Sequence, residues 1–265
     1  MTNHNTSPRR PWWWTDLLLA TIFLTRLPLP RVEMGDRTIM ETAWSFPFVG
    51  LVVGAGAAII LWLAIAVGLP APVAALLAIT ASVALTGALH EDGLADVADG
   101  FGGGHDAEGK IAIMRDSRIG TYGVIALVTI TGLKVAAITS LVESGELIVP
   151  ALSFVVAHSG GRALMVFIAG WLNPATDTGI GHTAGRPSTR TVWSSLAIAL
   201  VLCLLLLPIT GFIASVFAGV IATTALGVLA QRQIGGYTGD VLGATEQVAE
   251  TAILLALAAT AAGSE

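Results

Sequence analysis

The sequence has few charged residues, one cysteine and no long polar segment. Charged residues make up 12% of the 265 residues and hydrophobic residues 54%, whereas a soluble globular chain carries about 25% charged residues. The single cysteine, Cys203, excludes an intrachain disulfide framework. The 13 basic residues are scattered among 18 acidic ones and do not form the basic stripe that binds nucleic acid. Nucleic acid is therefore not an expected partner, and the lipid bilayer is.

The apolar residues are grouped in segments long enough to cross that bilayer. A spanning helix needs roughly 20 apolar residues, and seven segments qualify, near 46–67, 72–90, 119–141, 147–171, 191–210, 211–230 and 245–262. The connections between them are too short for a separate soluble domain. We therefore expect residues 1–265 to form a single integral-membrane catalytic domain, an all-α polytopic membrane protein of about seven transmembrane helices.

The first apolar segment, 15–27, is shorter than a span. It contains Asp16 and Arg26 and follows three tryptophans, which are typical of the headgroup belt. It is predicted to be an N-terminal interfacial or re-entrant helix. With seven crossings, the long loops that hold nearly all the basic residues fall on one side of the membrane. The positive-inside rule predicts that this side faces the cytoplasm.

Three aspartates follow the second predicted span in the string ALHEDGLADVADGFGGG. Asp92, Asp96 and Asp99 are spaced four and three apart, so on a helix their carboxylates project from one face. Such like charges repel unless a cation lies between them, and hard oxygen ligands favour Mg²⁺ or Mn²⁺. A solvated acidic helix end is the alternative. His90 adjoins the motif as a candidate further ligand or base, or as an interfacial hydrogen-bonded residue.

Glycines directly after Asp99 are predicted to let the backbone approach a ligand and to cradle an anion with N–H groups. They are Gly100, Gly102 and Gly103, together with Gly104. The downstream string IMRDSRIGTYG offers Arg115 and Arg118 for phosphate oxygens. Asp116 between them is placed to ligate a metal or to fix one arginine. The alternative for both arginines is that they follow the positive-inside rule.

Two further places carry polar residues in or next to predicted spans. His158 and Arg162 lie four apart in AHSGGRAL. An arginine at that depth is either a substrate-binding residue or a structural partner of a carboxylate. Asp240 lies between glycines in GGYTGDVLGATEQ and is a candidate substrate-binding residue, while Lys134 has no obvious partner in the sequence.

These strings in this order, with FLTRLPLP, FPFVG and HSGGR, resemble the adenosylcobinamide-GDP ribazoletransferase family, also called cobalamin (5'-phosphate) synthase. The resemblance covers nearly the whole chain. It implies a Mg²⁺-dependent enzyme of the bacterial inner membrane, with its active site facing the cytoplasm, in vitamin B12 synthesis. The 3'-hydroxyl of α-ribazole or α-ribazole 5'-phosphate attacks the cobinamide-linked phosphorus of adenosylcobinamide-GDP, and GMP leaves. A homo-oligomer is compatible with the sequence.

The resemblance and the residues together assign three sets of roles. The expected catalytic residues are Asp92, Asp96, His90, Arg115 and Arg118. The expected substrate-binding residues are Arg26, Gly93, Gly100, Gly102, Gly103, Arg162 and Asp240. The expected metal ligands are Asp92, Asp96, Asp99 and Asp116.

Two other functions also place carboxylates in a membrane protein. A CDP-alcohol phosphotransferase needs the pattern D-x-x-D-G-x-x-A-R, but Ala98-Asp99 stands where Ala-Arg is required. A cation transporter is expected to hold carboxylates near the membrane midplane, whereas the aspartates here follow the end of a predicted span. Both therefore rank below the transferase.

Overall fold

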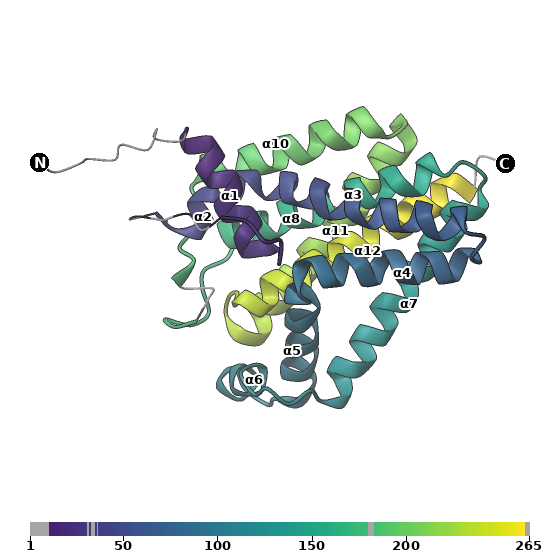
Figure 1. Cartoon of the computed structure of the whole chain (residues 1–265). Coiled ribbons are helices and arrows are strands. Elements are labelled where there is room, and N and C mark those ends of the chain that lie inside the picture. The colour runs from purple at the N-terminus through teal and green to yellow at the C-terminus, as the bar shows by residue number, and fades with distance from the viewer. Residues whose placement is uncertain (1–10, 31, 33–34, 36, 180–182, 263–265) are drawn as a thin grey trace, which may run out of the picture.

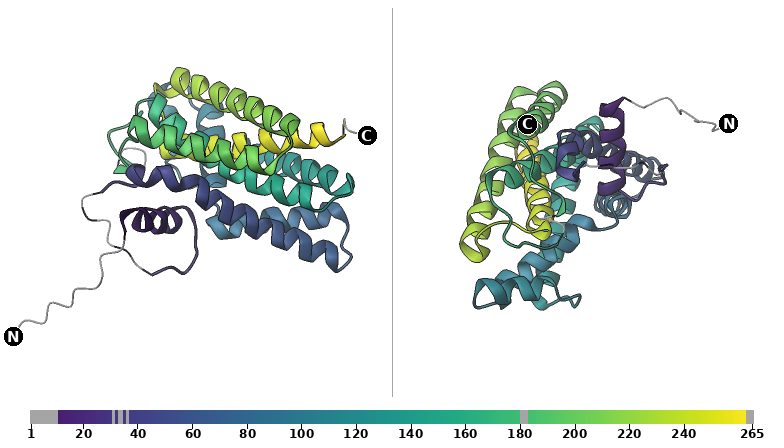
Figure 2. Two further views of the ribbon diagram at one scale, coloured as in Figure 1. Left: turned by 90° about the horizontal axis from the view of Figure 1, so that it is seen from above. Right: turned by 90° about the vertical axis from the view of Figure 1, so that its left-hand side faces the viewer.

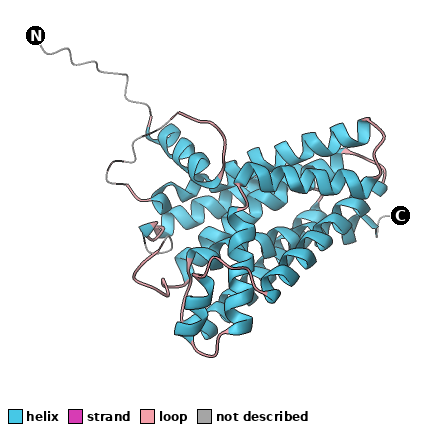
Figure 3. Cartoon of the chain, turned by 60° about the horizontal axis from the view of Figure 1, so that its bottom comes forward, coloured by secondary structure: helices cyan, strands magenta, loops and turns pink. Residues whose placement is uncertain are grey.

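The computed structural model describes residues 11–262 except 31, 33–34, 36 and 180–182. The described residues form helices joined by turns and loops (Figure 3), with one isolated β-bridge between Pro174 and Tyr237. The helices are α1 (Trp12–Leu24), α2 (Ile39–Thr42), η1 (Ala43–Ser45), α3 (Phe46–Ala66), α4 (Ala71–Thr86), α5 (Leu89–Gly103), α6 (Ala107–Met114), α7 (Thr121–Glu143), α8 (Ile148–Trp171), α10 (Thr189–Leu206), α11 (Ile209–Ile234) and α12 (Gly239–Ala262). The all-α prediction is confirmed.

The long helices form an elongated bundle (Figures 1 and 2). By length and composition, 6 of the described helical segments could cross a membrane, or up to 7 if α4 and α5 count as one bent span. Helices α8 and α12 form the centre, since 67% and 78% of their apolar windows are buried within the protein. Glycines permit this close packing. A Cβ on Gly54 of α3 would lie 2.7 Å from the backbone oxygen of Phe154 in α8.

The polar connections gather at one end of the bundle, as predicted. Figure 1 shows α1, α2, α6 and the start of α12 toward this end, with the end of α12 at the other. Helix α1 lies across the bundle end and is too short to be a span, in agreement with the predicted interfacial or re-entrant helix. Its Asp16 is fully buried, forms an ion pair with Arg37 and accepts a 2.8 Å hydrogen bond from the Trp44 indole.

A sharp bend separates α4 from α5 and sets the direction of the acidic motif. The two helices meet at an angle of 93°, and the bend is made by Gly87 and Ala88, with φ of 66° and 58°. Left-handed φ is easy for glycine and costly for alanine. Helix α5 therefore turns out of the direction of α4 and carries its aspartates to the polar end of the bundle.

Candidate functional site

The acidic motif lies on α5, where the start of α12 packs against it. Gly93 makes this approach possible, because a Cβ there would lie 2.7 Å from the Asp240 carbonyl oxygen. Asp92 and Asp240, from these two helices, line the same cavity. Helix α5 also buries Leu94, so the helix is packed against the bundle on this side. Gly93 was expected to bind substrate; in the structure it brings Asp240 next to the acidic motif.

Asp96 lies among these carboxylates and is only partly buried. Burial, and then the negative charges of Asp240, Asp92 and Asp99, raises the pKa of the Asp96 carboxyl to about 7. A divalent cation would relieve that repulsion. Asp92, Asp96 and Asp240 are open to solvent or to a cavity, and they supply only oxygen atoms. Carboxylate oxygens are the donors that Mg²⁺ prefers, and the ion usually takes one or two of them and completes its shell with water and substrate phosphates. Among the described residues these three carboxylates do not lie close enough together to form a closed metal cluster.

Asp99 has a different task from its two neighbours in the motif. One carboxylate oxygen accepts a hydrogen bond from the Gly120 N–H at 2.7 Å, and the other accepts from the Gly123 N–H at 2.9 Å. Gly120 is the N-cap residue of α7 and Gly123 lies in its first turn, where unpaired N–H donors attract a negative charge. Asp99 therefore caps α7, which explains its burial without a metal.

The two arginines of the IMRDSRIGTYG string lie in different surroundings. Arg115 lines a second cavity together with Thr178, Thr238 and Asp240, and donates a 3.0 Å hydrogen bond to the Thr178 hydroxyl. Because Asp240 lines both cavities, Arg115 faces the same region as the carboxylates. This combination of carboxylates, an arginine and hydroxyl groups suits a phosphate ester bound through a cation.

Arg118 is exposed and paired with Asp116. Its guanidinium donates to the Asp116 carboxylate at 2.7 Å. These hydrogen bonds hold the pKa of the Asp116 carboxyl below its usual range. Asp116 was predicted either to ligate metal or to fix one arginine, and the structure shows the second arrangement.

Three of the glycines after Asp99 do not form the anion-binding turn that the sequence suggested. Gly100, Gly102 and Gly103 belong to α5, which continues to Gly103. A Cβ at Gly100 would lie 2.9 Å from the Lys110 carbonyl oxygen of α6, and one at Gly102 would lie 2.6 Å from the Tyr122 ring of α7. The predicted turn is therefore wrong at these three positions, where the glycines serve helix packing, while their predicted contact with substrate stays a prediction.

Arg26, also expected to bind substrate, lies against the bend between α4 and α5. Its side chain packs against Gly87. The backbone N–H of Arg26 donates a hydrogen bond to the backbone carbonyl of Leu85 at 2.7 Å. It lines a separate groove with residues of α3 and α4. The structure thus places Arg26 at the bend rather than in the wall of either cavity described above.

Arg162 and Lys134 have carboxylate partners inside the bundle. The Arg162 guanidinium of α8 is completely buried and donates a 2.6 Å hydrogen bond to Glu246 of α12. The Lys134 ammonium of α7 lies 2.7 Å from Glu250 and 2.8 Å from the side-chain oxygen of Gln247. Of the two roles predicted for Arg162, the structure shows the pairing with a carboxylate.

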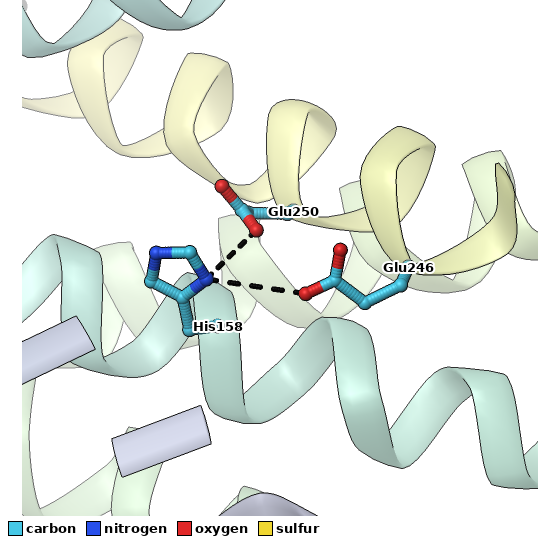
Figure 4. Close-up of side chains that lie close together, drawn as sticks. All are labelled: His158, Glu246 and Glu250. Atoms are coloured by element: carbon cyan, nitrogen blue, oxygen red, sulfur yellow. Dashed lines mark ion pairs between the residues drawn. The ribbon is translucent and has the colours of Figure 1, made fainter. Parts of the chain in front are cut away.

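His158, Glu246 and Glu250 bring one ligand atom each within 4.8 Å of one another (Figure 4). This spacing would suit a metal ion. Among the described residues, no other set of three histidine, cysteine or acidic side chains has its ligand atoms this close together. However, Arg162 and Lys134 already bind the two carboxylates, and the His158 Nδ1 lies 2.9 Å from Glu250. A divalent cation here would be repelled by two fixed positive charges, so we interpret the group as an ion-pair network.

The sequence did not predict this ion-pair network, although the spacing of the residues in it was a signal. Glu246 and Glu250 lie four apart on α12, and His158 and Arg162 lie four apart on α8. Each pair therefore occupies one helix face. The sequence did not show that these two helix faces contact each other. Gln247, which donates to Glu91 at 3.0 Å and to Glu246 at 2.9 Å, gave no signal at all.

The chain as a whole is similar to proteins of one family. A family model described as cobalamin-5-phosphate synthase matches residues 16–258. The chain is 43% identical over 249 residues to the adenosylcobinamide-GDP ribazoletransferase of Bradyrhizobium diazoefficiens, with 92% of this chain and 93% of the relative covered. It is 46% identical over 252 residues to the protein of the same name from Xanthobacter autotrophicus, covering 91% and 94%. No solved structure matches the chain.

Proposed function

This chain belongs to the cobalamin-5-phosphate synthase family, and on that premise we propose that it is a membrane transferase acting on adenosylcobinamide-GDP. The acceptor is α-ribazole or its 5'-phosphate, and GMP is released. One observation on the geometry of the site supports the proposal most directly. Asp240 lines both the cavity that contains Asp92 and the cavity that contains Arg115. Groups suited to a cation and to a phosphate ester therefore share one region at the polar end of the bundle.

In this proposal the residues of α5 and α12 hold Mg²⁺ and those around Arg115 hold the pyrophosphate. The ligands are Asp92, Asp96 and Asp240. When bound, the ion supplies positive charge that neutralises the pyrophosphate and the departing GMP. Arg115 and the Thr178 hydroxyl bind non-bridging oxygens. The oxygen of the acceptor hydroxyl forms the new bond to the cobinamide-linked phosphorus and gives up its proton. The bond from that phosphorus to GMP breaks, and GMP leaves with the electron pair.

The direct test is GMP release by the purified full-length protein in detergent with Mg²⁺. We expect release when adenosylcobinamide-GDP is offered with α-ribazole or with α-ribazole 5'-phosphate, and the ratio of the two rates identifies the preferred acceptor. CDP-diacylglycerol with an alcohol is the matched negative substrate. Release of CMP from that mixture, without GMP from the first, would replace the proposal with the lipid enzyme.

We further propose that the polar end of the bundle faces the cytoplasm of a bacterial inner membrane. The basic residues of the loops support this orientation, because the opposite end carries the connections near 67–70, 144–147 and 207–208, which contain no Lys or Arg. A reporter active only in the periplasm, fused to the C-terminus, is therefore expected to be active. A cytoplasm-only reporter that is active at the same position would contradict the orientation.

A further inference from the structure

His90 lies in the wall of the cavity that contains the acidic motif. Asp92, Gly93, Gly239 and Asp240 line the same cavity. The imidazole is almost fully buried, and within the described part of the chain its Nε2 atom has no hydrogen-bond partner. An unpartnered buried nitrogen is costly unless a ligand completes it. His90 therefore belongs to the cavity wall, and its Nε2 atom is enclosed by protein and left without a hydrogen-bond partner among the described residues.

The other ring nitrogen of His90 faces the ion-pair network. Its Nδ1 lies 3.7 Å from Oε2 of Glu246. A proton on Nδ1 points toward that carboxylate, whereas an unprotonated Nδ1 would set a lone pair against a negative charge. The carboxylate thus favours the tautomer with the proton on Nδ1, which leaves Nε2 as an acceptor.

Glu246 is held firmly enough to fix this arrangement. Its Oε1 accepts from Arg162 at 2.6 Å, and its Oε2 accepts from the Gln247 amide at 2.9 Å. Glu246 itself is fully buried. The second carboxylate of the same helix face, Glu250, is bound to Lys134 and His158 instead. The two glutamates are therefore alike in burial and pairing, but Glu246 is the one placed against Nδ1 of His90.

We propose that Nε2 of His90 accepts a hydrogen bond from the attacking hydroxyl of the ribazole acceptor, and that Glu246 is the residue that positions His90 for this. A hydroxyl that donates its hydrogen to His90 turns an oxygen lone pair toward the phosphorus held beside Asp92 and Asp240. Such orientation is a large part of the catalysis of group transfer. The inference rests on the proposed function and adds to it the residues that bind the acceptor.

Matched glutamine variants separate positioning from structure. Glu246→Gln is expected to lower kcat/KM for α-ribazole about 10- to 100-fold, by analogy with the loss seen when the carboxylate that orients a metal-bound histidine is removed. The KM for adenosylcobinamide-GDP and the binding of Mn²⁺ should stay unchanged. Glu250→Gln removes a carboxylate of equal burial from the same helix face and is expected to leave kcat/KM for α-ribazole close to that of the wild type. Equal losses in both variants would overturn the proposal.

Two replacements of His90 test the acceptor atom itself, including the case in which Glu246→Gln fails to fold. A glutamine side chain places a polar atom near the position of Nε2, while asparagine reaches only the position of Nδ1. His90→Gln should therefore retain more activity with α-ribazole than His90→Asn. Equal activity of the two variants would contradict the proposal.

Nitrogen-15 spectra of the labelled imidazoles provide a readout that does not depend on turnover. The His90 signal, assigned by its loss in His90→Gln, should report a proton on Nδ1 in the wild type and a change of tautomer in Glu246→Gln. A proton on Nε2 in the wild type would overturn the proposal. Absence of GMP release by the wild type would instead reject the proposed function, so the two failures are distinguishable.

Discussion

Replacing Asp96 with asparagine is expected to lower the rate of GMP release by about 10² to 10³, the usual cost of losing one electrostatic contact to developing charge. The side chain keeps its shape, and one of several mutually repelling charges disappears. Folding without metal should therefore survive or improve. Binding of Mn²⁺, followed by its electron paramagnetic resonance signal, should weaken in parallel. Added Mg²⁺ should restore part of the activity if affinity is the defect.

Asp99→Asn is the matched control, because it removes the same charge from the same helix. Both Asp99 oxygens accept from backbone N–H groups at the N-terminal end of α7, so the expected loss is in stability. Loss of a helix cap costs about 0.5–2 kcal/mol, and affinity for Mn²⁺ should hardly change. If both variants weaken Mn²⁺ equally, Asp99 is a ligand after all. If neither does, the proposed ligand set is wrong.

The double variant Asp92→Asn with Asp96→Asn asks whether the two aspartates share one ion. Ligands of a single ion act as a unit, so the double variant should lose much less activity than the product of the two single losses. Rates of GMP release at saturating substrate provide the comparison. Multiplicative losses with an unchanged Mg²⁺ requirement would show that Asp92 and Asp96 act independently.

Arg162→Met is expected to have the largest effect on folding. It removes the cation that binds Glu246 at 2.6 Å inside the bundle and leaves a buried carboxylate uncompensated. Breaking a buried ion pair from one side typically costs about 3–5 kcal/mol, so thermal unfolding in detergent should shift to clearly lower temperature. Adding Glu246→Gln should recover part of the loss, because the stranded charge is then removed.

Arg232→Met is the control for Arg162→Met, because Arg232 is exposed in the last turn of α11. Exposed substitutions usually change stability by no more than about 0.5 kcal/mol. Arg162→Lys distinguishes the two roles that the sequence left open. A stable protein with poor affinity for adenosylcobinamide-GDP would favour phosphate binding by Arg162, and normal affinity with lower stability would favour the ion pair.

The membrane-spanning pattern was predictable because it depends on local composition. A run of apolar residues must be helical in a bilayer, since its backbone groups have no water to bond. The predicted segments 147–171 and 245–262 accordingly coincide closely with α8 and the greater part of α12. The short, charged segment 15–27 could be separated from the spans by the same reasoning. The ends of the helices were predicted less accurately, because capping residues and bends determine where each helix ends.

The sequence by itself determined that this is a polytopic all-α membrane protein, and it predicted an acidic motif and an arginine string on the same side of the predicted spans. Those features follow from length, hydropathy and spacing, which are local properties.

Tertiary structure decided what the individual side chains face. The spacing of Asp92, Asp96 and Asp99 is the same on any helix, yet packing of α7 makes Asp99 a cap, and packing of α12 brings Asp240 to the motif. Lys134, Arg162, Glu246 and Glu250 likewise found their partners only through the meeting of α7, α8 and α12. A buried charge requires a partner, but the sequence does not say which residue, far along the chain, provides it.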